Sequence, residues 1–219
     1  MLLLGHRGAR RCAPENTMAA FECALVHGCH GFEFDVRLTS DGRCVICHDP
    51  QFAGRSIEIS RYDQLAPPPP CLPDVLQAFS SRAFLDIELK VTGLEAEVVA
   101  MLRDRPPERG YLVSSFLPVV IERLHAQDKS VPLGLICDSR RQFTAWTRLP
   151  IVAVFLERGL LVPGIVEELH TAGKQVFVWT VNREREMRHL AALGVEGIIS
   201  DDTRLLAQVL SMPAPSAAP

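Results

Sequence analysis

Short apolar blocks alternate with longer segments of helical period along most of this 219-residue chain. The blocks are rich in Val, Ile, Leu and Phe, which is typical of buried strands, and the longer segments repeat apolar residues with the spacing of amphipathic helices. This alternation predicts repeated strand–helix units and a parallel sheet. We expect eight strands, at residues 1–6, 31–36, 84–89, 111–115, 132–137, 151–155, 176–180 and 197–200.

Helical patterns fill the intervals between these strands. Glycines at positions 28, 173 and 194 stand where helices commonly stop. The expected helices are 17–27, 72–79, 94–104, 117–127, 139–147, 164–172, 183–193 and 202–210.

Eight strands with intervening helices fit a TIM (β/α)₈ barrel, for which about 250 residues are typical and about 200 are near the lower limit. An open doubly wound α/β sheet is the alternative. Its nucleotide-binding versions lose support, because G-x-G-x-x-G does not follow the first strand and G-x-x-x-x-G-K-[ST] is absent. We therefore expect a single domain over residues 1–211.

Two segments depart from the regular alternation. Residues 43–73 predict a short irregular insertion after the second barrel strand, with a short strand through Val45 and Ile46 and a stiff run from Pro67 to Pro70. The last residues, MPAPSAAP at 212–219, predict a disordered tail.

Composition narrows the class of protein. The net charge is −3 with acids and bases mixed, so no electrostatic footprint for nucleic acid or an anionic membrane is present. The opening MLLLGHRG lacks the features of a signal peptide, and no apolar run approaches the roughly 20 residues of a membrane span. We expect a soluble cytoplasmic protein whose seven cysteines are most simply free thiols.

The stretch CVICHD at residues 44–49 has the Cys-x-x-Cys-His spacing of covalent haem attachment, and Cys-x-x-Cys is also half of many zinc sites. Neither use is favoured, since export signals and a second close cysteine pair are lacking. We interpret Cys44 and Cys47 as small strand residues. His48 then needs another explanation.

Two predicted strands carry charges where a buried strand is expected to be apolar. In GFEFDV, period two sends Glu33 and Asp35 to one face, and in FLDIELK it does the same for Asp86, Glu88 and Lys90. Solvated edge strands are the alternative interpretation. Both faces of a parallel barrel strand are covered, however, and a carboxylate there is costly unless it is paired or bound to a metal.

Active sites of such barrels lie at the carboxyl ends of the strands. Glu33, Asp35 and Glu88 fall there, and carboxylate oxygens without soft ligands suit one hard cation, Mg²⁺ or Ca²⁺. His6 ends the first strand and His48 follows the short strand of the insertion, so one imidazole can remove a proton while the other donates one. The other five histidines are interpreted as structural: His27, His30, His125, His170 and His189.

Arg7 and Lys90 add permanent positive charge to the same cavity. A phosphate is the anion that best matches, because the guanidinium fork fits its oxygens and a hard divalent ion bridges it readily. A metal, two proton-transfer groups and cations together indicate phosphodiester cleavage.

The motifs GHRGARRCAPENT, GFEFDVRLTSDGRCVICHD, LDIELK, VSSF, VWTVN and GVEGIISD follow one another across nearly the whole chain. In this the sequence resembles the glycerophosphodiester phosphodiesterase family, whose hallmarks are H-R-G, P-E-N-T, E-x-D, T-x-D-G, H-D, E-x-K and W-T-V-N. The resemblance implies a TIM barrel that hydrolyses glycerophosphodiesters to glycerol 3-phosphate and an alcohol. It also implies metal ligands at Glu33, Asp35 and Glu88 and a catalytic pair at His6 and His48.

The same resemblance implies a set of substrate-binding residues. Arg7 and Lys90 match phosphate-contacting positions, and Glu15 matches a polar residue close to the metal site. Trp179, in VWTVN, resembles a family residue that forms a pocket wall near the glycerol. Phe116 is expected to form another part of that wall. The partner is thus a small molecule; the sequence predicts no oligomeric state.

The family mechanism starts with attack of the substrate's glycerol 2-hydroxyl on phosphorus, followed by opening of a cyclic phosphate by water. We expect His6 to act as base and His48 as acid in the first step. The segment from His48 to the 72–79 helix is shorter than in the family, which predicts a more exposed pocket. Asp201-Asp202 replaces the family's Asp-x-Pro, with Asp201 matched.

Two other functions stay open. A lysophospholipase D or phospholipase C-like activity on a lipid phosphodiester would use the same site, although no clear amphipathic membrane helix is present. A noncatalytic binding barrel would be expected to lack a histidine or a carboxylate of the set, and none is lost.

Overall fold

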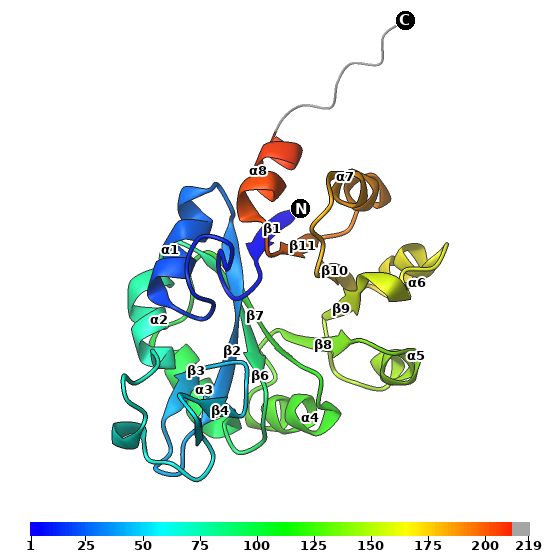
Figure 1. The fold of residues 1–219 in the computed structure, drawn as a ribbon. Coiled ribbons are helices and arrows are strands. Elements are labelled where there is room, and N and C mark those ends of the chain that lie inside the picture. Colours follow the sequence, from blue (N-terminus) through cyan, green and yellow to red (C-terminus); the bar gives the residue numbers. More distant parts are fainter. Residues whose placement is uncertain (212–219) are drawn as a thin grey trace, which may run out of the picture.

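Eight parallel strands close into a barrel in the computed structural model, which describes residues 1–211 (Figure 1). Neighbouring strands pair in chain order, and β1 closes the ring by pairing with both β2 and β11. The predicted TIM barrel and all eight predicted strands are confirmed, with ends that differ by two residues or fewer. The barrel strands are β1 (Leu2–Gly5), β2 (Gly31–Leu38), β6 (Phe84–Leu89), β7 (Tyr111–Ser115), β8 (Leu133–Cys137), β9 (Ala153–Glu157), β10 (Gln175–Trp179) and β11 (Gly197–Ser200).

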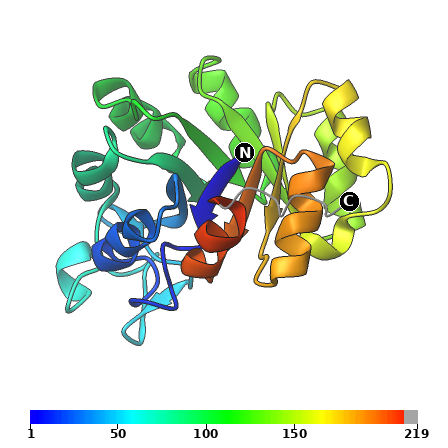
Figure 2. The same cartoon turned by 90° about the horizontal axis from the view of Figure 1, so that it is seen from above.

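Helices form a ring around the barrel (Figures 1 and 2). The predicted helix 139–147 is divided, because it is α-helical over its first part and a 3₁₀ turn, η2 (Thr144–Thr147), over the rest. Thr144 Oγ1 donates to the carbonyl of Arg141, a side-chain bond that competes with continued helix. The helices are α1 (Met18–Val26), α2 (Leu72–Phe79), α3 (Glu95–Asp104), α4 (Pro118–Gln127), α5 (Arg140–Phe143), α6 (Ile165–Thr171), α7 (Glu184–Leu193) and α8 (Thr203–Ser211).

The insertion after β2 lies at the carboxyl end of the barrel, on the same side as the loop that follows β1 (Figure 2). Its first strand, β3 (Cys44–Ile46), is the short strand predicted through Val45 and Ile46, and it pairs antiparallel with the end of β2. A small hairpin, a 3₁₀ turn and a hydrophobic cluster of Val45, Cys47, Ile57 and Leu65 complete it. The insertion therefore has a core of its own beside the pocket.

Strand periodicity divides the aromatic residues between two cores. On β2, Phe32 and Phe34 point outward and pack with Phe21 of α1 and Phe79 of α2. Inside the barrel a separate cluster is formed by Leu4, Leu112, Ile136, Ala153, Phe155, Phe177 and Ile199. The opposite face of β2, which carries Glu33 and Asp35, therefore points into the barrel.

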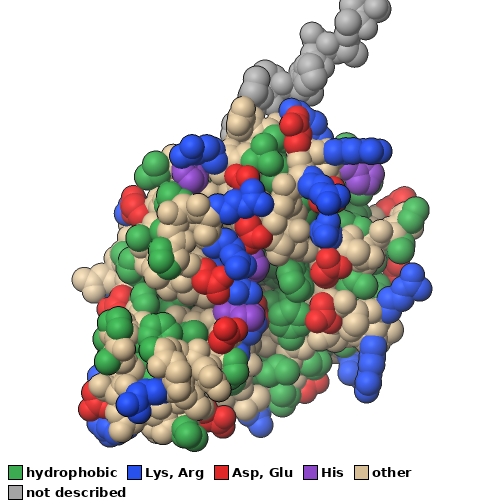
Figure 3. All heavy atoms as spheres, viewed as in Figure 1, with side chains coloured by type: hydrophobic (Ala, Val, Ile, Leu, Met, Phe, Trp, Pro, Cys, Tyr) green, Lys and Arg blue, Asp and Glu red, His purple; other side chains and the backbone are tan. Residues whose placement is uncertain are grey.

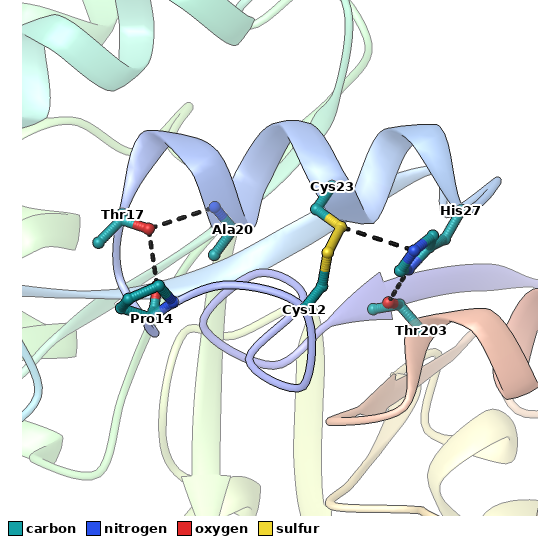
Figure 4. Close-up of a disulfide and its surroundings, with 7 residues drawn as sticks. All are labelled: Cys12, Pro14, Thr17, Ala20, Cys23, His27 and Thr203. Atoms are coloured by element: carbon teal, nitrogen blue, oxygen red, sulfur yellow. Dashed lines mark hydrogen bonds between the residues drawn. A yellow bond between two sulfur atoms is a disulfide. The ribbon is translucent and has the colours of Figure 1, made fainter.

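The cysteines differ from the expectation of seven free thiols. Cys12 and Cys23 form a disulfide between the β1–α1 loop and α1 (Figure 4), so the prediction is wrong for these two. They are 11 residues apart, and only the return of the loop along the helix brings them together. Cys44 and Cys47 are free, buried and packed in different hydrophobic clusters, as expected of strand residues.

Among residues 1–211, no helix has both the length and the apolar character to cross a lipid bilayer. This agrees with the absence of a predicted span, and the cytoplasmic location stays a prediction. Residues 212–219, predicted to be a tail, lie outside the described part of the chain.

Candidate active site

A pocket of about 260 Å³ opens at the carboxyl end of the barrel. Histidine and charged side chains gather around a hollow with hydrophobic walls near the middle of the face in Figure 3. Eight of the ten predicted site residues line this pocket, and the other two, Asp35 and Glu15, pair with Arg7 of the lining. The lining residues are His6, Arg7, Glu33, His48, Asp86, Glu88, Lys90, Phe116, Ile136, Asp138, Phe155, Trp179 and Ile199.

Three carboxylates converge at the floor of the pocket. Parallel pairing of β2 with β6 sets Asp35 beside Glu88, and Glu33 precedes Asp35 by two residues on the same face. One oxygen from each of the three lies within 4.8 Å of the others. All three residues are buried, with 1–7% of their surface exposed. The structure thus brings the predicted ligand set together.

Two cations partly balance these charges. Lys90 Nζ lies 2.6 Å from Glu88 Oε1 and 3.3 Å from Asp35 Oδ1, and Arg7 Nε lies 3.3 Å from Asp35 Oδ2. Burial alone would raise the pKa of Asp35, but Lys90, Arg7 and a hydrogen bond from Asn16 outweigh it, and the pKa is lowered. Asp35 is therefore an ionised anchor for both cations.

The other two carboxyl groups are less well compensated. Burial, followed by repulsion from Asp35, raises the pKa of Glu33 well above its usual value and that of Glu88 to about 7. Among the residues that the structure describes, no group hydrogen-bonds to Glu33 Oε1. A buried oxygen without a partner, in an all-oxygen donor set, fits a hard divalent cation that would supply the missing positive charge.

Asp86 was not among the predicted site residues, although the alternation in FLDIELK places it on the pocket face. It is fully buried and accepts a hydrogen bond of 2.6 Å from Ser114 Oγ. Burial raises its pKa well above the usual value. Burial therefore favours the neutral form of this carboxyl group, whereas Asp35 has a lowered pKa.

His6 is held by a chain of hydrogen bonds from the far end of the sequence. Its Nδ1 lies 2.7 Å from Asp201 Oδ1, and Asn182 donates to the other oxygen of Asp201 at 2.8 Å. Burial would raise the pKa of Asp201, but the bonds from His6 and Asn182 lower it to about 2. An ionised Asp201 fixes Nδ1 as the donor, which leaves Nε2 for the pocket.

Sequence reasoning gave no role to Asp201 or Asn182. The available signal was their position: Asp201 directly follows β11 and Asn182 is three residues after β10, at the end of the barrel where the other polar residues meet.

His48 has a more exposed partner. It follows β3, and the backbone N–H of Cys47 donates to the carbonyl of Asp35, which ties the insertion to the barrel floor. Its Nδ1 lies 2.7 Å from Asp49 Oδ1, and its carbonyl accepts from Arg37 Nε at 2.8 Å. Burial lowers the pKa of His48, against the pull of Asp35 and Asp49. Both imidazoles therefore face one pocket, each with a carboxylate behind it.

The β1–α1 loop holds Arg7 in place. Arg7 has a φ of 53°, a left-handed conformation that is uncommon outside glycine, and its backbone N–H donates to Glu33 Oε2 at 2.9 Å. Asn16 donates to Asp35 at 2.8 Å, and Glu15 accepts from Arg7 Nη1 at 2.7 Å. Glu15, predicted among the substrate-binding residues, does not line the pocket but orients Arg7. Asn16, within the P-E-N-T motif, was not predicted as a site residue.

The opposite wall is apolar. The rings of Phe116 and Trp179 meet edge to face with centroids 5.6 Å apart, and Lys90 Nζ lies 5.4 Å from the Phe116 centroid. Ile136, Phe155 and Ile199 continue this wall, and Asp138 adds a carboxylate at the rim. One side of the pocket thus suits an anion and the other a short carbon chain.

Comparisons with known proteins agree with this geometry. A model of the glycerophosphoryl diester phosphodiesterase family matches residues 6–63 and 70–205. A glycerophosphodiester phosphodiesterase of Caldanaerobacter subterraneus subsp. tengcongensis is 28% identical over an alignment that covers 94% of this chain and 96% of that protein.

Solved structures share the fold. An Oleispira antarctica phosphodiesterase in complex with the product sn-glycerol-3-phosphate superposes with a TM-score of 0.88, covering 97% of both chains at 23% identity. A glycerophosphodiester phosphodiesterase from Thermotoga maritima gives 0.80, with 95% of this chain and 98% of that chain covered at 25% identity. The predictions of the family and of an enzyme are confirmed, and the chain belongs to the glycerophosphoryl diester phosphodiesterase family, whose members are hydrolases.

Proposed function

We propose that this protein hydrolyses glycerophosphodiesters to glycerol 3-phosphate and an alcohol, with one divalent cation, Mg²⁺ or Ca²⁺, and two histidines. The observation that carries the proposal is the convergence of three buried carboxylates, one with an unpartnered oxygen, in a pocket lined by two imidazoles. The names of the relatives support the substrate class, since one is a glycerophosphodiester phosphodiesterase and another was solved with glycerol 3-phosphate.

Glu33, Asp35 and Glu88 would hold the cation. When bound there, it would offset the negative charge that grows on the phosphoryl oxygens as the new bond to phosphorus forms. Arg7 and Lys90 already pair with these carboxylates, so they stand close enough to donate hydrogen bonds to the same phosphoryl group. The apolar wall of Phe116 and Trp179 packs against the glycerol carbons and excludes water from them.

His6 acts as the base of the first step. Asp201 keeps Nδ1 protonated, so Nε2 takes the proton of the glycerol 2-hydroxyl as that oxygen attacks phosphorus. Asp201 also stabilises the imidazolium that results, because its pKa of about 2 keeps it ionised. The arrangement resembles the orientation of a catalytic histidine by a buried carboxylate in hydrolases of other folds.

His48 acts as the acid and protonates the departing alcohol oxygen. Its lowered pKa makes the imidazolium a strong proton donor, and the negative charge of a bound phosphodiester favours its protonation before the reaction. Water then opens the cyclic phosphate with the two roles exchanged. Each histidine thus ends the cycle in the protonation state in which it began.

Replacing either histidine tests the function. His6→Asn and His48→Asn are expected to lower turnover of glycerophosphocholine by about 10²–10⁴-fold, the usual contribution of a positioned acid or base. His189→Asn, at an exposed position of α7, is the matched control and is expected to keep full turnover. Wild-type activity in either pocket variant would remove that histidine from the mechanism.

The same assay separates the alternative activity. A panel of glycerophosphocholine, glycerophosphoethanolamine and a lysophospholipid compares small and lipid phosphodiesters under one set of conditions. The pocket of about 260 Å³ is near the small end for ligand sites, so the water-soluble diesters are expected to be turned over faster. Faster turnover of the lysophospholipid would favour the lipid phosphodiester as substrate.

A further inference from the structure

A second group of metal-ligating side chains lies outside the barrel, between the β1–α1 loop and helix α1 (Figure 4). It contains Cys12, Cys23 and His27, and one ligand atom from each lies within 4.8 Å of the others. In the structure the two sulfurs form a disulfide. Two thiols and an imidazole are also the donor set of a soft metal site, so in its reduced state this cluster offers ligands for a metal ion.

The helix sets the distance between two of the donors. Cys23 and His27 are four residues apart and therefore lie on one face. Cys23 Sγ is 3.5 Å from His27 Nε2. Bonds of about 2.3 Å to sulfur and about 2.0 Å to nitrogen put two ligands of a tetrahedral Zn²⁺ about 3.5 Å apart. This edge of the site already has the spacing that zinc requires.

The imidazole is oriented by a hydrogen bond on its other side. His27 Nδ1 lies 2.7 Å from the hydroxyl oxygen of Thr203, a buried residue that begins α8. When Nδ1 carries the proton and donates a hydrogen bond to that hydroxyl, the lone pair of Nε2 points toward the sulfurs (Figure 4). Metal-bound histidines almost always have such a partner, which fixes the tautomer and the ring orientation.

The third donor can reach the same ion. The Cα atoms of Cys12 and Cys23 are 6.7 Å apart, so the thiolates can take the roughly 3.8 Å separation of two zinc ligands by side-chain rotation. Cys12 is exposed and the other two residues are half-buried, which lets an ion enter from solvent. With three protein ligands, water completes the tetrahedron.

We propose that the reduced chain binds one Zn²⁺ through Cys12, Cys23 and His27, and that the disulfide is the metal-free, oxidised form of the same site. In the conversion, the two thiolates lose two electrons, a sulfur–sulfur bond forms and Zn²⁺ leaves. A low-molecular-weight disulfide accepts the electrons and is split into two thiolates. Both forms cross-link the loop to α1, so the loop that carries Arg7 and Asn16 stays anchored in either state.

Cobalt spectroscopy tests the site without any measurement of turnover, so the result is independent of the proposed function. The full chain is reduced with a phosphine, freed of reductant without oxygen and titrated with Co²⁺. We expect a near-ultraviolet thiolate-to-cobalt band and visible bands of tetrahedral cobalt that saturate as Co²⁺ is added and disappear when excess Zn²⁺ follows. The carboxylate site offers only oxygen ligands and gives no thiolate band.

Variants assign the band to these residues. The double variant Cys12→Ser, Cys23→Ser is expected to abolish it, and His27→Gln to lower the metal affinity by at least tenfold. Thr203→Val removes only the orienting hydroxyl and is expected to cost about tenfold in affinity. Cys71→Ser, at a half-buried free thiol outside the cluster, is the matched control and is expected to keep the band.

Two results would overturn the proposal. The first is the absence of a thiolate–cobalt band in reduced wild type whose free thiols have been counted and found intact. The second is a band that persists in the double variant while circular dichroism reports an intact fold. The air-oxidised wild type, with the disulfide closed, is expected to give no band, and a band there would equally contradict the exchange of metal for disulfide.

Discussion

The two halves of the barrel interior are built differently. Strands β2 and β6 direct Glu33, Asp35, Asp86 and Glu88 into the barrel, whereas the interior of the half formed by β8 to β11 is mostly apolar, with Phe155 as one of its large residues. The charged half gathers like charges that repel one another, and the apolar half buries surface that stabilises the fold. Binding chemistry and stability are thus assigned to different strands of one barrel.

Changing a carboxylate is expected to have the largest effect on turnover and little effect on stability. Glu88→Gln should lower turnover of glycerophosphocholine by roughly a thousandfold, or about 4 kcal/mol of transition-state stabilisation, because the cation loses a charged ligand. The melting temperature should stay the same or rise, since repulsion from Asp35 is relieved. Glu97→Gln, at an exposed position of α3, is the control for both assays.

A change in the apolar half is expected to do the reverse. Phe155→Ala should lower the free energy of unfolding by about 3–5 kcal/mol, because the ring is buried and stacks on Phe177 with centroids 4.7 Å apart. Urea denaturation measures the loss, and calcium affinity, measured by calorimetry on the folded variant, should not change. An unaltered urea midpoint would show that the stability of the barrel does not depend on this half.

pH is expected to separate the halves because the buried carboxyl groups with raised pKa values, Glu33, Asp86 and Glu88, lie on β2 and β6. Glu88 has its pKa raised from 4.5 to about 7, so between these values the native chain binds protons that the unfolded chain has released. The metal-free protein therefore loses stability as pH rises through this window, and cation affinity falls as pH drops below about 7, by up to tenfold per pH unit for each carboxyl group.

Thermal unfolding with and without Ca²⁺ measures this linkage. The increase in melting temperature caused by Ca²⁺ should be larger at about pH 8 than at about pH 5.5. Glu88→Gln should flatten the pH dependence of the metal-free protein over the same window. An equal increase at both pH values would contradict the raised pKa of Glu88.

The aromatic edge of the pocket, where the two halves meet, should give the smallest effect. Phe116→Leu removes the edge-to-face contact with Trp179 and the ring beside Lys90, interactions worth about 0.5–1.5 kcal/mol. We expect KM for glycerophosphocholine to rise by up to about tenfold with kcat little changed, as measured by steady-state kinetics. A fall in kcat with constant KM would instead place Phe116 close to the reacting atoms.

The sequence predicted the carboxylates of β2 and β6 better than the residues that hold the histidines and the loop of the site in place. Carboxylates alternating with aromatic residues on β2 are a local signal, and the apolar blocks of the other strands are equally local, so the barrel and the carboxylate set could both be predicted. The bond between His6 and Asp201 joins residues 195 apart, and only closure of the barrel between β1 and β11 brings them together. A reading of local patterns cannot measure that distance.

Loop geometry limited the prediction in a second way. Glu15 of the β1–α1 loop is predicted to bind substrate, and in the structure it accepts a hydrogen bond from the Arg7 guanidinium and does not line the pocket. The same loop runs back along α1 and brings Cys12 to Cys23, a pairing that no close cysteine spacing indicates. Backbone turns of this kind depend on contacts from several strands, so residue types alone do not predict them.

Chelation of the disulfide-bonded protein shows whether the three carboxylates hold a cation on which phosphodiester hydrolysis depends. Turnover of glycerophosphocholine is measured after removal of divalent ions and again after addition of Mg²⁺ or Ca²⁺. We expect activity to be lost and then restored by one equivalent of bound ion in wild type, and not to be restored in Asp35→Asn. Full turnover by the metal-free protein in excess chelator would contradict it.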